Sequence, residues 1–352
     1  MNRGVHIVTT GFTPRDAISQ HVIEEQTFIR SLGLRCEIFA EPKMTHPAYR
    51  DRARDVREWS RLAQSDDAAI LHYSIASPAI DHVLDRAARC GLVYHNITPA
   101  EMLRDYAPAL ARECEQGRRR LAELADRVVA TVADSAYNAN ELIALGFPEP
   151  RIGGILLPSL TTTSPIVRAS GGRTRLLFVG RGVPNKAQHD LILALAALRE
   201  VAVDAELLLV GGWGGLEAYH RHCQWLARAA GVADRVTFAG SIDDTELAEA
   251  YASSDLFLCL SDHEGFCVPL VEAMAADLPI VAFASSATPG TVGQAGLVLD
   301  QKTPSLVAEA VMETLANPEL RDWMAAGRQE RLAFHHPDQV RSRLHPFVEN
   351  LA

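Results

Sequence analysis

The feature that most constrains this fold is a repeated pattern of a short apolar run, a loop and then a longer helical stretch. In the first half of the chain, Val5–Thr10 has the composition of a buried strand, and Ile18–Leu32 has that of the helix after it. Further apolar runs follow at Cys36–Ala40, Ala68–His72, Leu92–His95 and Val128–Val132. Nearly continuous apolar strands that alternate with helices predict a parallel sheet covered by helices on both faces.

The same pattern starts again after a segment of linker composition. Residues 158–173 are rich in Pro, Ser, Thr and Gly, which is typical of a connection between domains. A chain of 352 residues is also long for one core, and it suits two domains of about 150 residues each. The second series of apolar runs comprises Leu176–Gly180, Glu206–Gly211, Arg235–Ala239, Leu256–Leu260 and Pro279–Ala284.

The two series predict an α/β protein of two Rossmann-like, doubly wound domains that face a central cleft, with ligands at the carboxyl ends of the strands. The first domain is expected over residues 1–160 and the linker over 161–173. The second domain is expected over residues 174–336. A C-terminal helix over residues 337–352 could cross back to the first domain.

Charge and cysteine usage exclude several classes of protein. The formal net charge of −10 argues against general affinity for nucleic acid. The six cysteines form no C-x-x-C pair and no zinc-spaced cluster, which is typical of a reduced, cytoplasmic chain. The N-terminus lacks the apolar core of a signal peptide, and no apolar run approaches the roughly 18 residues of a membrane span. Any contact with a membrane is therefore expected at its surface.

The strongest chemical signal is a segment in which Glu264 and Glu272 are separated by seven residues. Glu264 lies in the loop after an apolar run, whereas Glu272 lies on the first turns of a helix that Pro269 is well placed to start. Two carboxylates on such a platform can accept hydrogen bonds from vicinal diols, one on a transferred sugar and one on a ribose. Taken singly, each glutamate is more simply a partner of the helix dipole or a solvated loop charge. Four backbone amides are expected to point toward an anion or a sugar near the helix N-terminus, those of Gly265, Phe266, Cys267 and Val268.

This segment, Glu264-Gly-Phe-Cys-Val-Pro-Leu-Val-Glu-Ala-Met274, resembles the E-x7-E motif of glycosyltransferase family 4, whose members have the GT-B fold. The resemblance covers residues 175–330 closely and the first half of the chain more weakly. It implies a retaining hexosyltransferase that uses a UDP- or GDP-hexose and needs no metal or other cofactor. It also implies that Glu264 lies beside the donor sugar and that Glu272 binds the ribose of the nucleotide.

A second segment, Phe178–Lys186, carries two cations in a loop that contains glycine. Arg181 and Lys186 stand five positions apart, directly after an apolar run that ends at Gly180. A nucleoside diphosphate gathers negative charge as it leaves, and cations or backbone amides must stabilise it when no metal is present. The chain has no D-x-D triplet, and this loop is neither a Walker A loop nor a G-x-G-x-x-G fingerprint. The matching V-G-R…K segment of family 4 contacts the diphosphate, so the resemblance assigns that role to Gly180, Arg181 and Lys186.

Two further loops of the second half resemble family segments that act through their backbone. Gly211–Gly215 resembles the V-G-x-G turn close to the nucleotide, which points to Gly212, although a plain strand-to-helix turn needs the same glycines. Gly240-Ser-Ile242 resembles the loop that contacts the base, which points to Ser241 and Ile242. Backbone recognition carries no side-chain code, so uracil and guanine remain alternatives.

In the first half, His95 ends an apolar run at the edge where ligands are expected. A lone histidine is more often a packed or surface residue, but this one resembles the histidine that family members place against the donor sugar and phosphate. The loop at Gly11 holds a single glycine, whereas relatives are richer in glycine there and touch the diphosphate. The loops after the apolar runs supply four candidates for contact with the acceptor, which are Gly11, Arg15, Asp16 and Asn96.

The combined prediction is a hexosyltransferase of polysaccharide or glycoconjugate biosynthesis, acting on a carbohydrate, glycolipid or natural-product acceptor. It is expected in the cytoplasm, and at the inner face of the membrane if the acceptor is lipid-linked. The arginine-rich segments at 50–61 and 118–120 could dock such an acceptor, but interspersed acidic residues favour solvated helix faces. A sugar phosphorylase or nucleotide-sugar epimerase of the same fold, and a non-catalytic protein that binds nucleotide sugars, stay open as alternatives. Nothing in the sequence specifies an oligomeric state.

Overall fold

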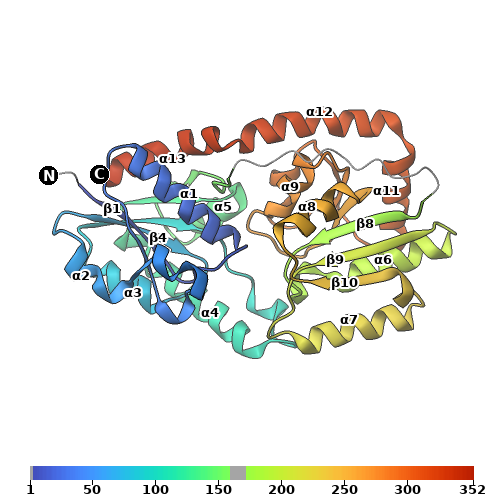
Figure 1. Cartoon of the computed structure of the whole chain (residues 1–352), viewed down its shortest axis with the longest axis horizontal. Coiled ribbons are helices and arrows are strands. Elements are labelled where there is room, and N and C mark those ends of the chain that lie inside the picture. Colours follow the sequence, from blue (N-terminus) through green and yellow to red (C-terminus); the bar gives the residue numbers. More distant parts are fainter. Residues whose placement is uncertain (1–2, 159–171) are drawn as a thin grey trace. The chain divides into compact units, whose positions relative to one another are not determined.

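The computed structural model describes residues 3–158 and 172–352, which divide into two compact units. Unit 1 comprises residues 3–100, 111–158 and 335–352, and unit 2 comprises residues 101–110 and 172–334. The predicted linker lies outside the described residues, except for residues 172 and 173. Each unit is a sheet flanked by helices (Figure 1).

Unit 1 is built on a parallel sheet in the order β3-β2-β1-β4-β5-β6-β7. Its strands are β1 (Val5–Thr9), β2 (Ile38–Ala40), β3 (Arg54–Asp55), β4 (Ala68–Tyr73), β5 (Arg89–Tyr94), β6 (Ala130–Ala133) and β7 (Arg151–Ile152). Its helices are α1 (Ala17–Ser31), α2 (Trp59–Leu62), α3 (Pro78–Leu84), α4 (Pro108–Ala122, which begins in unit 2), α5 (Ala136–Ala144) and α13 (Pro337–Leu351). The central strands β1 and β4 are buried along their whole length, as their apolar composition predicts.

Unit 2 is built on a second parallel sheet in the order β10-β9-β8-β11-β12-β13. Its strands are β8 (Thr174–Val179), β9 (Ala205–Val210), β10 (Val236–Gly240), β11 (Leu256–Cys259), β12 (Ile280–Phe283) and β13 (Leu297–Leu299). Its helices are α6 (Gln188–Glu200), α7 (Glu217–Ala229), α8 (Asp244–Ala252), α9 (Val268–Ala275), α10 (Thr288–Val292), α11 (Pro304–Ala316) and α12 (Pro318–His335), of which only the last residue belongs to unit 1. The two sheets confirm the predicted doubly wound α/β architecture.

Each sheet has one point at which the strand order reverses. The order runs outward from β1 toward β3 and from β4 toward β7 in unit 1, and outward from β8 and β11 in unit 2. Loops that leave the two central strands of such a sheet diverge, and ligands bind between them at the carboxyl ends. In unit 2 these loops are the two segments that carry Lys186 and Glu264.

The C-terminal helix α13 packs on β5, β6 and β7 of unit 1. Its apolar side chains, such as Leu344 and Phe347, are fully buried. A Cβ atom on Gly91 in β5 would lie 2.7 Å from Cζ of Phe347, so glycine allows the close approach of helix and strand. Arg343 Nε also donates a hydrogen bond of 3.1 Å to the Gly153 carbonyl. Within the described residues, none of the helices combines the length and apolar composition that a membrane span requires.

Candidate active site

Three glycine-containing loops lie side by side at the carboxyl edge of the second sheet, after β8, β9 and β10. The Gly182 N–H donates to the Gly212 carbonyl (2.9 Å), and the Gly211 N–H donates to the Gly240 carbonyl (2.8 Å). Gly211 has φ 139°, and a Cβ atom there would lie 2.0 Å from the Gly180 carbonyl oxygen. Only glycine fits such an approach. The predicted donor residues Gly180, Gly212 and Ser241 are therefore neighbours along one edge.

The predicted residues Lys186 and Glu264 form an ion pair between the loops after β8 and β11. Lys186 Nζ lies 2.5 Å from Glu264 Oε2, and the two side chains are 20% and 6% exposed. Burial by itself lowers the pKa of the Lys186 ammonium, but the Glu264 carboxylate outweighs that effect and holds the pKa above its usual value. The pair therefore places a lasting cation and a nearly buried carboxylate at the switch point of the sheet.

Asn185 joins the same two loops and was not predicted from the sequence. Its side-chain amide donates to the His263 carbonyl (3.2 Å), and its own carbonyl accepts the Asp262 N–H (2.8 Å). The side chain is buried, with 4% exposure. An asparagine in a polar loop carries no pattern that distinguishes this bridge from a solvated residue.

The side chain of Arg181 differs from that of Lys186 because it is exposed. Its carbonyl accepts a hydrogen bond from Gln188 Nε2 (2.8 Å), which holds the loop against the start of α6. Over residues 3–158 and 172–352, no acidic side chain forms an ion pair with its guanidinium. The loop after β8 thus presents a cation without an internal partner.

The start of α9 supplies a backbone donor beside Glu264. Cys267 precedes the helix with φ 72° and ψ 72°, and no side chain caps the N-terminus. Pro269 has no N–H, and the Leu270 N–H donates to the Cys267 carbonyl (3.1 Å), so the Val268 N–H is the first-turn group offered to an anion or a sugar hydroxyl. Phe266 is 5% exposed, and its carbonyl accepts a hydrogen bond from Thr291 Oγ1 (2.6 Å), so the loop is tied to α10.

The second glutamate of the motif has a different partner. Glu272 lies on α9, as predicted, and Tyr251 Oη of α8 donates to its Oε2 at 2.7 Å. Burial raises the pKa of the Glu272 carboxyl, and the Tyr251 hydrogen bond opposes this rise. Tyr251 is itself buried and was not predicted, because it lies 21 positions before Glu272 in a different helix.

A metal-type cluster also lies under this loop. Cys259, Glu264 and Cys267 offer ligand atoms that all lie within 4.8 Å of one another. A divalent cation there would share Glu264 with the Lys186 ammonium, which already lies 2.5 Å from that carboxylate. The Lys186 ammonium therefore already neutralises part of the negative charge that a cation would meet there.

In unit 1, His95 takes part in a buried row of hydrogen bonds. His95 Nδ1 lies 2.8 Å from Asp134 Oδ2, and His95 Nε2 lies 2.8 Å from His72 Nδ1. The row continues from His72 Nε2 to Glu25 Oε2 at 2.7 Å. Both ring nitrogens of His95 are thus engaged within unit 1. This ring could form a hydrogen bond to a nucleotide sugar only if one of these contacts were broken.

The predicted acceptor residues also have structural partners. Asn96, with φ 72°, donates through Nδ2 to Asn138 Oδ1 (2.8 Å) and Glu141 Oε2 (2.6 Å). Asp16 caps α1 by accepting the Ser19 N–H at 2.9 Å. The two remaining candidates lie in the loop after β1, where the Gly11 carbonyl accepts from Thr9 Oγ1 and Arg15 has φ 60°. Contact with an acceptor stays a prediction for all four, and for Asn96 and Asp16 it would compete with these internal bonds.

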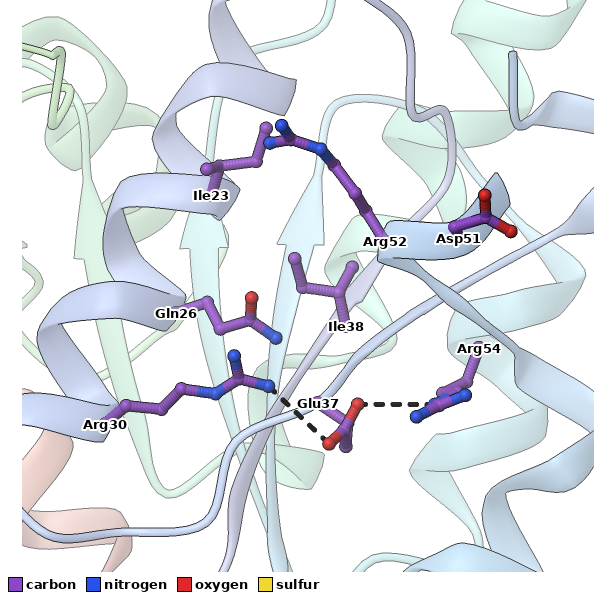
Figure 2. Close-up of a pocket in the computed structure, with 8 residues that line it drawn as sticks. All are labelled: Ile23, Gln26, Arg30, Glu37, Ile38, Asp51, Arg52 and Arg54. Carbon is purple, nitrogen blue, oxygen red and sulfur yellow. Dashed lines mark hydrogen bonds and ion pairs between the residues drawn. The ribbon is translucent and has the colours of Figure 1, made fainter. Parts of the chain in front are cut away.

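A pocket of about 290 Å³ lies elsewhere in unit 1, between α1, β2 and the segment 51–54 (Figure 2). Ion pairs cross it from Glu37 to Arg30 (3.5 Å) and to Arg54 (3.3 Å). None of the predicted site residues lines this pocket. Its Glu37 is already paired with two of the lining arginines, so it is a depression at the sheet edge rather than part of the predicted site.

Comparison with known families agrees with this geometry. The sequence model described as "Glycosyl transferases group 1" matches residues 161–331. The match includes the loop of Arg181 and Lys186 and the complete segment from Glu264 to Glu272, which confirms the resemblance predicted for the second half.

Curated relatives match between half and two thirds of the chain. A GDP-mannose-dependent alpha-(1-6)-phosphatidylinositol monomannoside mannosyltransferase of Mycobacterium tuberculosis is 35% identical over 51% of this chain and 48% of its own length. A D-inositol 3-phosphate glycosyltransferase of Thermomonospora curvata is 31% identical over 60% of this chain and 54% of its own length. The chain therefore spans about half the length of the curated relatives it matches.

Solved structures match almost the whole chain in fold. A sucrose-phosphate synthase from Thermosynechococcus elongatus has a TM-score of 0.77 at 17% identity and covers 99% of each chain. Anabaena HepE in complex with UDP and glucose has a TM-score of 0.75 at 18% identity and covers 99% of this chain and 100% of its own. Together with the two parallel sheets, these matches confirm the predicted GT-B type of α/β fold.

Proposed function

We propose that this chain is a retaining hexosyltransferase that binds a UDP- or GDP-hexose mainly through unit 2. The observation that carries the proposal is the Lys186–Glu264 ion pair in the two loops that border the switch point of the second sheet. Ligands of doubly wound sheets bind at that point. The exposed Arg181 adds a second cation, and the Val268 amide at the uncapped start of α9 adds a backbone donor for the diphosphate.

The reaction assigned to this site divides the charges between two tasks. Lys186 and Arg181 stabilise the diphosphate as the bond from the sugar carbon to the phosphate oxygen breaks. The acceptor oxygen attacks from the same face, forms the new bond to that carbon, and passes its proton to the departing phosphate. Glu264 accepts hydrogen bonds from the sugar hydroxyls, and no step uses it as a nucleophile because Lys186 already holds its carboxylate.

The names of the relatives suggest the first substrates to test. Matches at 35–36% identity carry GDP-mannose in their names, and others name an inositol phosphate or a phosphatidylinositol as acceptor. GDP-mannose is accordingly the donor proposed first, with inositol-containing acceptors as the first acceptors. Such a lipid-linked acceptor would bring the protein to the cytoplasmic surface of the membrane.

The deciding experiment is a donor panel. UDP-glucose, UDP-galactose, GDP-mannose and GDP-glucose are each incubated with the protein, with and without acceptor, and free UDP or GDP is measured. Release of GDP from GDP-mannose that rises with acceptor supports the proposal, and the anomeric configuration of the product tests retention. Tight donor binding without any release would favour a non-catalytic binding protein, and release that requires inorganic phosphate would favour a phosphorylase.

Metal independence belongs to the same proposal. In this proposal Arg181 and Lys186 supply the positive charge that a metal would otherwise bring to the diphosphate, so turnover should be unchanged, within about twofold, in excess EDTA. The check is the initial rate in EDTA, compared with the rate after Mg²⁺ or Mn²⁺ is restored. A large loss that either metal reverses would contradict the assignment of these two side chains.

A further inference from the structure

The row from Asp134 to Glu25 is a second cluster of titratable groups, apart from the donor site. It draws on four elements, since Glu25 is on α1, His72 on β4, His95 follows β5 and Asp134 follows β6. The side chains of all four are between 0% and 2% exposed. His21 lies against the same row, and its ring centroid is 5.2 Å from that of His72 and 5.7 Å from that of His95. Such a concentration of buried ionisable groups is costly unless their protons are well placed.

The same residues include the elements of a metal site, but the hydrogen bonds exclude one. His21, Glu25 and His72 have ligand-type atoms within 4.8 Å of one another. However, His21 Nδ1 accepts the backbone N–H of Leu156 (2.8 Å), and a backbone amide can only donate. Neutral His21 must then carry its proton on Nε2, which prevents this nitrogen from coordinating a metal. Burial lowers the pKa of His21 to about 3, which keeps the ring neutral.

The tautomer of His21 supplies a donor where the row has a free acceptor. His21 Nε2 and Glu25 Oε1 are buried and have no hydrogen-bond partner among the described residues. Because Nε2 carries a proton, the two atoms are complementary. A carboxylate accepts such a proton more strongly than a neutral acid does. His21 therefore favours the ionised form of Glu25, whereas burial alone raises the pKa of Glu25 and favours the neutral form.

Among the proton arrangements that satisfy the row with the same number of protons, two keep Asp134 ionised and His72 uncharged. In the first, neutral Glu25 donates to His72 Nε2, His72 Nδ1–H donates to His95 Nε2, and His95 Nδ1–H donates to Asp134. In the second, Glu25 is a carboxylate that accepts from His72 Nε2–H, and His95 carries protons on both nitrogens. The two differ only in the shift of one proton from Glu25 to His72 and of another from His72 to His95.

We infer that the second arrangement is the working one, so that Glu25, His72 and Asp134 are positioning residues that hold a second proton on His95. The Asp134 carboxylate beside His95 outweighs the effect of burial and holds the pKa of His95 above its usual value. Burial and the neighbouring His95 lower the pKa of His72 far below its usual value, so His72 relays protons but does not keep the charge. The row thus places its positive charge on the residue that follows β5, at the carboxyl edge of the sheet.

This charge has a use if the proposed function is correct, because the substrates of such an enzyme carry phosphate. An imidazolium at the carboxyl end of β5 attracts a phosphate group through its charge, without a hydrogen bond from either ring nitrogen. The titratable groups that act on His95 come from α1, β4, the N-cap of α1 and the loop after β6, and they are Asp16, His21, Glu25, His72 and Asp134. The phosphate belongs either to the donor diphosphate or to a phosphorylated acceptor.

The protonation itself is tested on the unaltered protein by NMR of ¹⁵N-labelled histidine rings. At pH 7, His95 should show protons on both ring nitrogens, His21 on Nε2 alone, and His72 on one nitrogen. A singly protonated His95 at pH 7 would overturn the inference whatever the activity. This measurement requires no variant and no substrate, so it stays independent of the donor panel.

A matched pair of variants then tests the positioning role. Glu25→Gln removes the buried carboxylate and should lower the pKa of His95 by about one unit. The control is Glu24→Gln on the same helix, which removes a carboxylate that lies 3.6 Å from Arg341 and should leave His95 unchanged. If the Glu25 variant folds and titrates like the wild type, the assignment of Glu25 is wrong.

Kinetics supply a readout that a purely structural role would not change. At low pH His95 is protonated in both proteins, so the Michaelis constants of Glu25→Gln and wild type should agree. As the pH rises the variant loses the charge first, because the pKa of its His95 is lower, and its Michaelis constant should then exceed that of the wild type by up to about tenfold. A ratio that is the same at low and at high pH would contradict the inference.

The choice of substrate identifies which phosphate is attracted. The pH-dependent ratio is measured for GDP-mannose, and separately for D-inositol 3-phosphate against uncharged inositol. If the ratio depends on pH only for GDP-mannose, His95 attracts the phosphate of the donor. If it depends on pH only for the phosphorylated inositol, His95 attracts the phosphate of the acceptor. If no donor is turned over, the proposed function fails while the NMR result still decides the state of His95.

Discussion

The carboxyl edges of the two sheets use their polar residues in opposite ways. At the edge of unit 2, Lys186 and Glu264 pair with each other while Arg181 stays exposed. At the edge of unit 1, His95 and Asn96 are turned inward and bonded to other residues of the unit. Short motifs can therefore mark the edge of unit 2, since Arg181 and Lys186 share one loop, and Glu264 and Glu272 share one loop and the helix after it. The edge of unit 1 is assembled from elements far apart in the sequence.

The largest effect is expected from removing the cations of unit 2. Lys186→Ala should lower kcat by about 10²–10³, the usual cost of losing a preorganised group that stabilises developing charge. It also leaves the 6%-exposed Glu264 side chain without its ammonium, so some loss of thermal stability is expected as well. Steady-state kinetics and a melting curve separate the two effects.

Arg181→Ala should lower kcat by a similar factor without loss of stability, because the side chain is exposed. Lys43→Ala, an exposed lysine of unit 1, is the control and should match the wild type. Near-normal turnover in both the Lys186 and Arg181 variants would contradict the comparison of the two edges, in which the edge of unit 2 supplies the cations for the reaction.

The next effect separates the two glutamates of the motif. Glu272→Gln should weaken donor and free nucleoside diphosphate alike, by about 1.5–3 kcal/mol, as expected for a hydrogen bond to a charged group. Glu264→Gln should spare nucleoside diphosphate affinity, because the glutamine carbonyl can still accept from Lys186, but should reduce turnover and blur the choice of hexose, since it weakens the contact with the sugar. Calorimetric titration with UDP and GDP, together with donor kinetics, decides between them. The opposite pattern would reverse the roles, and a trapped glycosyl ester on either residue would overturn the mechanism.

A smaller effect is expected at Tyr251, which holds Glu272 from the neighbouring helix. Tyr251→Phe removes the 2.7 Å hydrogen bond and should weaken nucleoside diphosphate binding by about 1 kcal/mol. Combined with Glu272→Gln, the two losses should not add, because they remove the same interaction. Full additivity in this double-mutant cycle would show that Tyr251 acts independently of Glu272.

The parts of the fold that could be predicted are those with a local composition signal. The buried strands β1 and β4 and the helix α1 follow directly from apolar runs and periodicity, with ends displaced by one or two residues. The edge strands β3 and β7 were missed because they are two residues long and largely exposed, so no apolar pattern marks them. The approach of α13 to the sheet of unit 1 depends on Gly91, whose role only appears once Phe347 is placed against it.

The residues of the site also divide into those with a local signal in the sequence and those without one. Glu264 and Glu272 were predicted because their spacing within one loop and helix is itself the signal. Asn185 and Tyr251 were missed because their importance lies in partners 78 and 21 positions away. His95 was predicted from its place at the end of an apolar run, but its partner Asp134 lies 39 positions further on. Long-range pairing of buried polar groups leaves no local pattern in a single sequence.

The smallest effect is expected at Cys267. At this position of the motif we expect the backbone conformation to matter more than the side chain. Cys267 has φ 72° and ψ 72°, a left-handed conformation that costs a residue with a Cβ atom about 1 kcal/mol and costs glycine almost nothing. Cys267→Gly gains this energy but gives up a thiol that is 9% exposed, a loss of similar size.

In Cys267→Gly, the relief of the left-handed backbone and the loss of the buried thiol should nearly cancel. The free energy of unfolding should therefore lie within about 1 kcal/mol of the wild type, and the donor kinetics within about twofold. Cys267→Val is the matched opposite, because a β-branched side chain disfavours the left-handed conformation and should displace the first-turn amides of α9. Its Michaelis constant for the donor should therefore rise while that of the glycine variant does not. Melting curves and donor kinetics of the two variants give the answer. Equal losses in both would mean that the thiol itself, through its contacts with Cys259 and Glu264, supports the donor site.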